Sequence, residues 1–313
     1  MTPRFLTMIS ALAVLTAAAV AGQTLARTPD GQPDLQGIWT NISITPMERP
    51  AQFAGKEFMT AQEAAAYEKQ FMERRDQRDS VDTTGPFKEA WFDSGTAVVK
   101  TRRTSIVIDP PDGKIPALTP EAQKAERARR EALRRPPLSP EDRQLNERCI
   151  MWPTDGPPMI SSSYNNNYRI VQTPGYVAIY IEMIHDVRLI PLDGRPHLPS
   201  NIRNWMGDSR GHWEGETLVV DTTNFTDKTS FHGSDRNLHV IERFTRTAPD
   251  TLLYQFTIDD PTAFAGKWTG EVPWSPAPGP IYEYACHEGN YVTMDAMLRN
   301  ARAEEEAAKK TSK

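Results

Sequence analysis

The ionisable residues of most interest interrupt an otherwise apolar run, residues 176–190, in the second half of the sequence. The run is rich in β-branched and aromatic residues, has turn-forming residues at both ends and lacks a helical period, so it predicts one long strand. Four ionisable side chains lie in it: Glu182, His185, Asp186 and Arg188. Burying such groups lowers the stability of the fold unless they are paired, so an unpaired one indicates a functional role. A carboxyl beside an apolar wall can have its proton affinity raised and act as a general acid or base.

A strand places alternate residues on opposite faces, which divides this run in two. One face holds Ile179, Ile181, Met183, His185, Val187 and Leu189, and the other holds Tyr180, Glu182, Ile184, Asp186, Arg188 and Ile190. We expect the first face to pack in the core. The second mixes aliphatic and charged groups and predicts the wall of a ligand cavity. There Asp186 and Arg188 can pair, whereas Glu182 needs a partner on a neighbouring strand; the alternative is a structural ion pair inside a β-barrel.

His185 and His239 are the two histidines inside predicted strands. A lone strand histidine is usually a hydrogen-bonded core residue, whereas two that face one cavity indicate acid–base work. In the catalytic hypothesis, either histidine is the base, and Asp186 or Glu182 sets its orientation. Arg188 then stabilises the negative charge that develops on the substrate.

Substrate-binding candidates come from two polar loops and from the cavity face of the long strand: Tyr164, Asn166, Tyr180, Trp205, Asp208 and Arg210. The loop at 164–168 offers phenols and amides, which suit sugar or phenol recognition, although an Asn-rich turn explains it equally well. The loop at 204–210 lies between strands, where functional residues often gather. Its charged pair, Asp208 and Arg210, can bind a substrate, with Arg210 as the alternative to Arg188, or can brace the loop.

The sequence contains none of the local patterns that bind metals or nucleotides. Its six histidines are scattered, with no H-x-H, H-x-x-x-H or H-E-x-x-H spacing, so no metal site is expected. A glycine-rich phosphate loop, a dinucleotide fingerprint and G-x-S-x-G are also absent. We therefore expect no cofactor, and a lyase or isomerase fits better than a hydrolase. The formal net charge of -5 gives no broad basic field, which argues against nucleic acid as a partner.

Strand patterns dominate the chain from residue 169 onward, with Pro-Gly, Asp-Gly and Glu-Gly turns between them. The predicted strands are a short one near 35–41, a hairpin at 104–116, and residues 169–173, 176–190, 217–222, 238–247, 252–259 and 281–285. Sequential strands without intervening helices predict a mainly β fold of α+β class, an antiparallel β-barrel or sandwich. It is lipocalin-like by fold analogy alone.

Helical insertions are predicted in the N-terminal half. A capping box at Thr60 and Glu63 begins a helix that runs to about 79, and Thr119 with Pro120 begins another that runs to 135. A short helix is expected at 139–149. The arginines of the second helix favour solvated i,i+4 ion pairs over a basic binding surface.

The expected domains are a signal peptide at 1–26, one β-barrel domain at 27–300 with a helical insertion at about 119–149, and a charged tail at 301–313, as a frayed helix or as disorder. Arg4, the apolar residues that follow it and a small-residue cleavage site predict the signal peptide and a periplasmic or secreted protein without stable membrane insertion. Cys149 and Cys286 either form a disulfide or are two unrelated buried thiols.

Four stretches carry a resemblance: residues 28–39 (TPDGQPDLQGIW), 184–197 (IHDVRLIPLDGRPH), 205–215 (WMGDSRGHWEG) and 283–291 (EYACHEGNY). The chain resembles an uncharacterised family of secreted bacterial β-rich proteins along nearly its whole mature length. The resemblance implies a β-rich fold and export. It implies no catalytic residue.

These patterns favour an exported enzyme that needs no cofactor and performs acid–base chemistry, as a lyase or isomerase, on a small apolar molecule, aromatic ones included, in a barrel cavity. The alternative is a periplasmic protein that binds a hydrophobic ligand without catalysis. A third hypothesis is a carbohydrate-binding module that uses Trp205, Trp213, Trp268 and Trp274.

Overall fold

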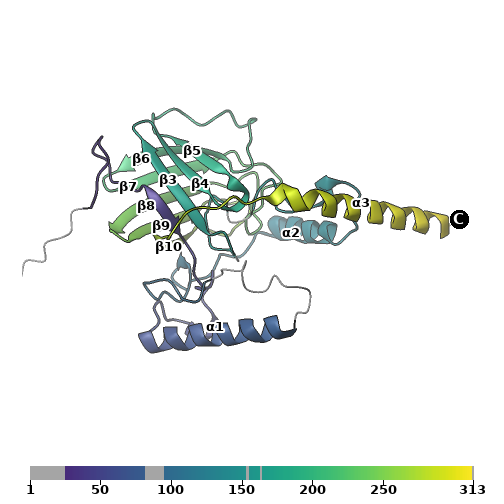
Figure 1. Ribbon diagram of the computed structural model, residues 1–313, viewed down its shortest axis with the longest axis horizontal. Helices are drawn as coiled ribbons and strands as arrows, with labels where there is room; N and C mark the ends of the chain where they lie inside the picture. Colours follow the sequence, from purple (N-terminus) through teal and green to yellow (C-terminus); the bar gives the residue numbers. More distant parts are fainter. Residues whose placement is uncertain (1–24, 82–94, 153–154, 163, 312–313) are drawn as a thin grey trace, which may run out of the picture.

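The computed structural model describes residues 25–81, 95–152, 155–162 and 164–311, and Figure 1 shows their arrangement. The predicted signal peptide lies outside the described residues except for its last two. The strands in this part of the chain are β1 Gly37–Thr40, β2 Val107–Asp109, β3 Asn167–Thr173, β4 Tyr176–Ile181, β5 Val187–Pro191, β6 Asp208–Glu214, β7 Thr217–Thr223, β8 Val240–Ala248, β9 Thr251–Ile258 and β10 Trp268–Pro276.

The strands pair antiparallel in the order β5-β4-β3-β1-β10-β9-β8-β7-β6, with β2 beside β1 on the same edge of β10. The two ends of this order, β5 and β6, lie against each other. A Cβ at Gly211 of β6 would come within 2.7 Å of the side chain of Ile190 on β5, so only glycine fits there. The sheet is therefore a nearly closed barrel. We call the junction of β5 and β6 the seam. The prediction of a mainly β, antiparallel barrel is confirmed.

Aromatic side chains fill the barrel. Every second residue is buried along β9 and along residues 240–244 of β8, including Phe244 and Tyr254. Trp274 of β10 stacks on Tyr168 of β3 with ring centroids 4.6 Å apart. Each such ring contributes roughly 1.5–3 kcal/mol by leaving water. Trp268 and Trp274 have no exposed surface, so they cannot stack on a sugar ring as the carbohydrate-binding hypothesis requires.

The prediction of one long strand at 176–190 is wrong. The run forms a hairpin, β4 and β5, joined by the one-turn helix η3 Met183–His185. Ile184 and His185 take positive φ angles of 59° and 52°. Composition predicts such angles chiefly at glycine, asparagine and aspartate, so the sequence does not indicate this turn. Because the chain reverses, the predicted faces also exchange: Val187 and Leu189 are exposed and do not pack in the core.

Other strand predictions fail for reasons of pairing. The hairpin predicted at 104–116 does not form, because β2 pairs with the distant β10. Residues 281–285 have no regular structure and lead into a helix. β10 is absent from the sequence prediction because Pro273 argues against a strand. Pro273 is tolerated because it lies between the part of β10 that pairs with β2 and the part that pairs with β1.

Helices lie outside the barrel (Figure 1). They are α1 Ala61–Val81, α2 Pro120–Leu133 and α3 Cys286–Thr311, with single turns η1 Ala51–Phe53, η2 Pro140–Asp142 and η3. The capping box of α1 is confirmed: Glu63 N donates to Thr60 Oγ1 at 3.2 Å, and Thr60 N donates to Glu63 Oε2 at 2.7 Å. Thr119 caps α2 as predicted. The helix predicted at 139–149 is limited to η2. Residues 301–311 are the last part of α3, which agrees with the helical alternative for the charged tail.

The ion pairs on α2 agree with the prediction of a solvated charged face. Arg130 contacts Glu126 at 2.7 Å and Arg135 contacts Glu131 at 3.3 Å, each four residues apart. No helix in the described part of the chain combines the length and apolar character needed to cross a bilayer.

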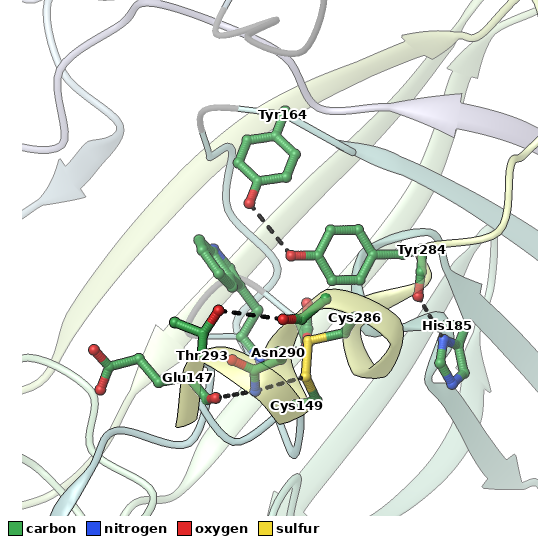
Figure 2. The surroundings of a disulfide bond; sticks show 11 residues. Glu147, Cys149, Tyr164, His185, Tyr284, Cys286, Asn290 and Thr293 are labelled. Atoms are coloured by element: carbon green, nitrogen blue, oxygen red, sulfur yellow. Dashed lines mark hydrogen bonds between the residues drawn. A yellow bond between two sulfur atoms is a disulfide. The ribbon is translucent and has the colours of Figure 1, made fainter. Parts of the chain in front are cut away.

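Cys149 and Cys286 form a disulfide, so the first of the two alternatives is confirmed. Figure 2 shows that it ties the first residue of α3 to the segment after α2. Asn290 of α3 adds a hydrogen bond to the carbonyl oxygen of Glu147. α3 otherwise extends away from the barrel (Figure 1), so the disulfide anchors its base.

Replacing both cysteines by serine should lower the free energy of unfolding by about 2–4 kcal/mol, because the bond closes a loop with a sequence separation of 137. Urea denaturation of the oxidised wild type and the double variant measures this loss. The variant should be insensitive to reductant, whereas reductant should shift the wild type to the midpoint of the variant. Equal midpoints for the oxidised wild type and the variant would show that the bond constrains only α3.

Candidate functional site

A pocket of about 310 Å³ opens at the seam of the barrel. Residues 186–189, in the β4–β5 turn and β5, form one wall, and residues 204–209, in the loop before β6 and its first residues, form the other. Four of the predicted site residues line it: Asp186, Arg188, Trp205 and Asp208. The structure thus brings together residues from the predicted strand and from the predicted loop, and we call this the seam pocket.

Arg188 lines the seam pocket and is fixed by hydrogen bonds to two other side chains. Its Nη1 and Nη2 donate to the two carboxylate oxygens of Glu242 on β8 at 2.9 and 2.5 Å, and both side chains are almost fully buried. Nη2 also lies 3.3 Å from Ser209 Oγ on β6. Burial opposes the charge on Arg188, but Glu242 outweighs burial and raises the pKa of the guanidinium. Nε is buried and has no hydrogen-bond partner among the described residues.

The predicted pairing of Asp186 with Arg188 is wrong, because Glu242 on the far side of the seam takes the guanidinium. Asp186 is half-buried, accepts a hydrogen bond from Val187 N at 3.0 Å, and forms no ion pair with a described residue. Burial raises its pKa above the ordinary aspartate value, and its backbone hydrogen bond opposes the rise only in part. Asp186 is therefore a carboxyl of weakened acidity that lines the pocket beside a fixed N–H donor.

Glu182 is buried, and the hydrogen-bond partners of its carboxylate are an asparagine side chain and a backbone N–H, not a histidine. Asn167 Nδ2 on β3 donates to it at 2.7 Å, which supplies the neighbouring-strand partner that the sequence requires. Tyr282 N donates to its other oxygen at 3.2 Å. Glu182 therefore holds the hairpin turn against the segment that leads to α3, and it does not orient His185.

The two strand histidines do not share a cavity with the seam residues. His185 is exposed in the hairpin turn, with Nδ1 3.1 Å from the carbonyl oxygen of Tyr284 (Figure 2). His239 faces outward from the start of β8, with Nε2 2.8 Å from Asp221 Oδ2. Neither lines the seam pocket. The prediction that they act as its base is wrong, because the hairpin turn and the outward face of β8 carry them elsewhere.

His239 belongs to a hydrogen-bonded chain on the outside of β6 and β7. Asp221 bridges His239 and His197, with His197 Nε2 at 2.9 Å, and His197 Nδ1 lies 3.1 Å from Asp208 Oδ2. Arg210 Nη1 donates to Asp208 Oδ1 at 2.6 Å, which confirms the bracing alternative for this pair. The hydrogen bond to Asp221 raises the pKa of His239. Burial would raise the pKa of Asp221, but the two histidines outweigh burial and lower it.

The remaining substrate-binding candidates lie apart from the seam pocket. Tyr180 alternates outward on β4, opposite the buried Ile179 and Ile181, so its predicted place on the cavity face is wrong. Asn166 accepts from Ser162 N at 2.6 Å and braces its own turn. The hydroxyl of Tyr164 lies 3.3 Å from that of Tyr284 beside the disulfide (Figure 2).

Asp155 is a buried titratable residue that interacts electrostatically with Asp186 and that the sequence prediction misses. Its side chain is fully buried, and burial raises its pKa to about 8, with the charge of Asp186 adding to the rise. Trp152 N donates to Oδ2 at 2.7 Å, while Oδ1 has no partner in the described part of the chain. Asp155 stands between glycine- and proline-rich residues, a composition that predicts an exposed turn, so the sequence holds no signal for its burial.

Metal binding finds no support in the geometry. Among the described residues, no group of three or more histidine, cysteine, aspartate or glutamate side chains is arranged to hold a metal ion. The His197–Asp221–His239 chain is a set of hydrogen bonds between ring nitrogens and carboxylate oxygens.

Comparisons with known proteins add little to this description. No protein-family model matches the chain, and no curated protein matches it. Among solved structures, a mutant of the fluorescent protein UnaG is similar over 43% of this chain and 86% of that one, with 14% sequence identity and a TM-score of 0.24. A TM-score this low does not show a common fold, so the barrel is established by the strand pairings of this chain.

Proposed function

We propose that this protein binds a small molecule in the seam pocket and moves a proton on it, with Asp186 as general base and acid. The observation that carries the proposal is the pairing, in one pocket wall, of a carboxyl whose pKa is raised by burial with a buried guanidinium that keeps one N–H unpartnered among the described residues. Perturbed carboxyls in pockets are typical of acid–base sites.

The two groups divide the work of an isomerisation. The Asp186 carboxylate takes a proton from the carbon next to a carbonyl or carboxyl group of the substrate, and the electron pair moves onto the substrate oxygen. Arg188 Nε donates a hydrogen bond to that oxygen. In a substrate with a carbon–carbon double bond β,γ to that group, protonated Asp186 then returns the proton to the γ carbon. The electron pair moves back from the oxygen and the double bond shifts to the α,β position, so no proton is gained or lost. Because Glu242 neutralises the guanidinium, Arg188 acts through a fixed N–H dipole rather than through net charge.

The pocket also limits the ligand. Its volume is near the lower end of small-molecule sites, and Trp205 and Met206 supply an apolar part in a lining that is mostly polar. This favours a small carbonyl or carboxyl compound with a short flat or aliphatic body. The aromatic filling of the barrel leads us to place the ligand at the seam instead of in the barrel interior.

Export is part of the proposal. The N-terminal apolar segment favours a signal peptide, and the disulfide supports an oxidising compartment.

The Asp186→Asn variant tests the proposed reaction. A thermal-shift screen of small aromatic and aliphatic carbonyl and carboxyl compounds first finds ligands, and each is then incubated with the protein in D2O. Proton NMR measures deuterium entering a carbon position, which reports proton transfer without knowledge of the product. We expect Asp186→Asn to slow this exchange at least about 100-fold with little change in ligand affinity.

Asp193→Asn is the matched control, because Asp193 lies just beyond β5, is partly exposed and pairs only with Arg195 among the described residues. It should exchange at the wild-type rate. Equal loss in both variants, or none in Asp186→Asn, would contradict the catalytic role. Ligands that shift the melting temperature but never exchange would favour the alternative, a binding protein without catalysis.

A further inference from the structure

A second pocket lies away from the seam, between α2, the segment after it and the loop before β8. Its volume is about 390 Å³. Apolar side chains from all three elements line it, among them Leu133, Trp152, Phe231 and Leu238. We call it the α2 pocket. It shares no lining residue with the seam pocket.

Basic side chains stand at the same pocket. Arg143 and Arg148 line it, with side chains only 20% and 16% exposed, and exposed Lys228 lines it from the barrel side. Arg143 Nη2 pairs with Glu147, but its Nε is buried and has no partner among the described residues. A buried N–H donor without a partner is unfavourable, so a ligand that brings a hydrogen-bond acceptor to it would be stabilised.

Two of the three acidic residues that line the pocket are already engaged, and the third, Asp227, is exposed. Asp142 Oδ2 accepts from the backbone of Leu138 and Ser139, which lowers the pKa of this carboxyl. Glu141 lies 3.5 Å from Arg148 and is mostly exposed. Glu147 balances the charge of Arg143, so what remains for a ligand there is the N–H donor at Nε, for which an anionic group is the strongest acceptor.

The wall that carries Arg143 is also held in place. Cys149 in the same segment is bonded to Cys286 of α3, and Asn290 of α3 donates to the carbonyl of Glu147 (Figure 2). A wall fixed at two points keeps the pocket formed without a ligand, which lowers the entropic cost of binding.

We infer that the α2 pocket is a second binding site, for an amphipathic organic anion with one carboxylate or sulfonate group. The apolar body lies on Trp152, Phe231 and Leu238, and the anion accepts from Arg143 Nε. This site does not depend on the proposed function of the seam.

The fluorescent sulfonate 8-anilinonaphthalene-1-sulfonate is the probe. We expect one saturable site on the folded protein, at micromolar concentration, from which decanoate displaces the probe and decanol does so at least about tenfold less well. Arg143→Met should weaken probe binding at least about tenfold, whereas Arg130→Met, which removes an exposed arginine of α2 outside the pocket, should not.

A second variant, which fills the pocket with a large side chain, tests the site independently in case Arg143→Met does not fold. Ala132 is exposed on α2 and lines the pocket, so Ala132→Trp should fill the pocket and abolish probe binding. Ala125→Trp, two turns earlier on α2, should bind as the wild type does. Circular dichroism checks the fold of each variant. Unchanged binding in both Arg143→Met and Ala132→Trp, many weak sites, or loss of binding in Asp186→Asn would overturn the inference.

Discussion

The Asp155→Asn variant should gain stability over the wild type as the pH rises from 5 to 8. Asp155 is fully buried, and burial raises its pKa to about 8, whereas an aspartate in the unfolded chain titrates near pH ~4. Between these two values the unfolded chain has released the proton and the folded chain has kept it. Folding therefore takes up a proton, and the free energy of unfolding falls as the pH rises.

The sign and size follow from proton linkage. The contribution of a group whose pKa is higher in the folded state is complete below its unfolded pKa and is lost as the pH rises through its folded pKa. Each pH unit costs the wild type about 1.4 kcal/mol in this window, so the stability of the variant relative to the wild type should increase by on the order of 4 kcal/mol from pH 5 to pH 8. Asparagine does not titrate, yet it can still accept the hydrogen bond from Trp152 N.

Urea midpoints of both proteins at several pH values measure this difference. Asp193→Asn is the control, since the hydrogen bonds from Arg195 lower the pKa of Asp193 and place its titration below the window. Its stability relative to the wild type should stay flat. A flat line for Asp155→Asn as well would mean that water reaches Oδ1 and that the carboxylate is ionised at neutral pH.

Local patterns in the sequence predict those parts of the fold that depend on neighbours in the chain. The capping box at Thr60, the cap at Thr119 and the alternation of β8 and β9 all involve residues a few positions apart, and all are present in the structure. Long-range pairing is invisible to such patterns. β10 takes β9 on one edge and β1 and β2 on the other, and these partners, which outweigh the signal of Pro273 against a strand, cannot be read from neighbours in the chain.

The site was predicted in part because its residues are of an unusual type for their place. Charged side chains in an apolar run point to Asp186 and Arg188, and both do line the seam pocket. Their partners could not be predicted. The turn at Ile184 and His185 reverses the chain, removes His185 from the wall and turns Arg188 towards Glu242, which stands 54 residues away in the sequence.

Breaking the Arg188–Glu242 pair should destabilise the protein by about 3–5 kcal/mol in either single variant, Arg188→Met or Glu242→Met. Both side chains are nearly without exposed surface, so removal of one leaves the charge of the other buried without its partner. The control is an exposed pair that also uses β8, Arg243 with Glu214 at 2.8 Å. Arg243→Met should cost no more than about 1 kcal/mol, because water screens that pair.

The double variant, Arg188→Met with Glu242→Met, should recover most of the lost stability, because two apolar side chains of similar length replace a desolvated ion pair. Recovery should be incomplete by about 1 kcal/mol, since the Tyr254 hydroxyl loses Glu242 Oε1, its acceptor at 2.9 Å. Urea denaturation of the four proteins gives the coupling energy as a double-mutant cycle. A double variant no more stable than the single variants would show that the pair specifies the closure of the seam.

The same four proteins separate the structural role of Arg188 from its proposed role in binding. If the guanidinium matters only to the fold, a double variant with restored stability should regain the ligands found for the seam pocket. If Nε holds the ligand, the restored protein should still fail to bind them, because no donor replaces it. The α2 pocket provides an internal reference, since its probe should bind all correctly folded variants equally. Loss of seam ligands with retained probe binding is the result we expect.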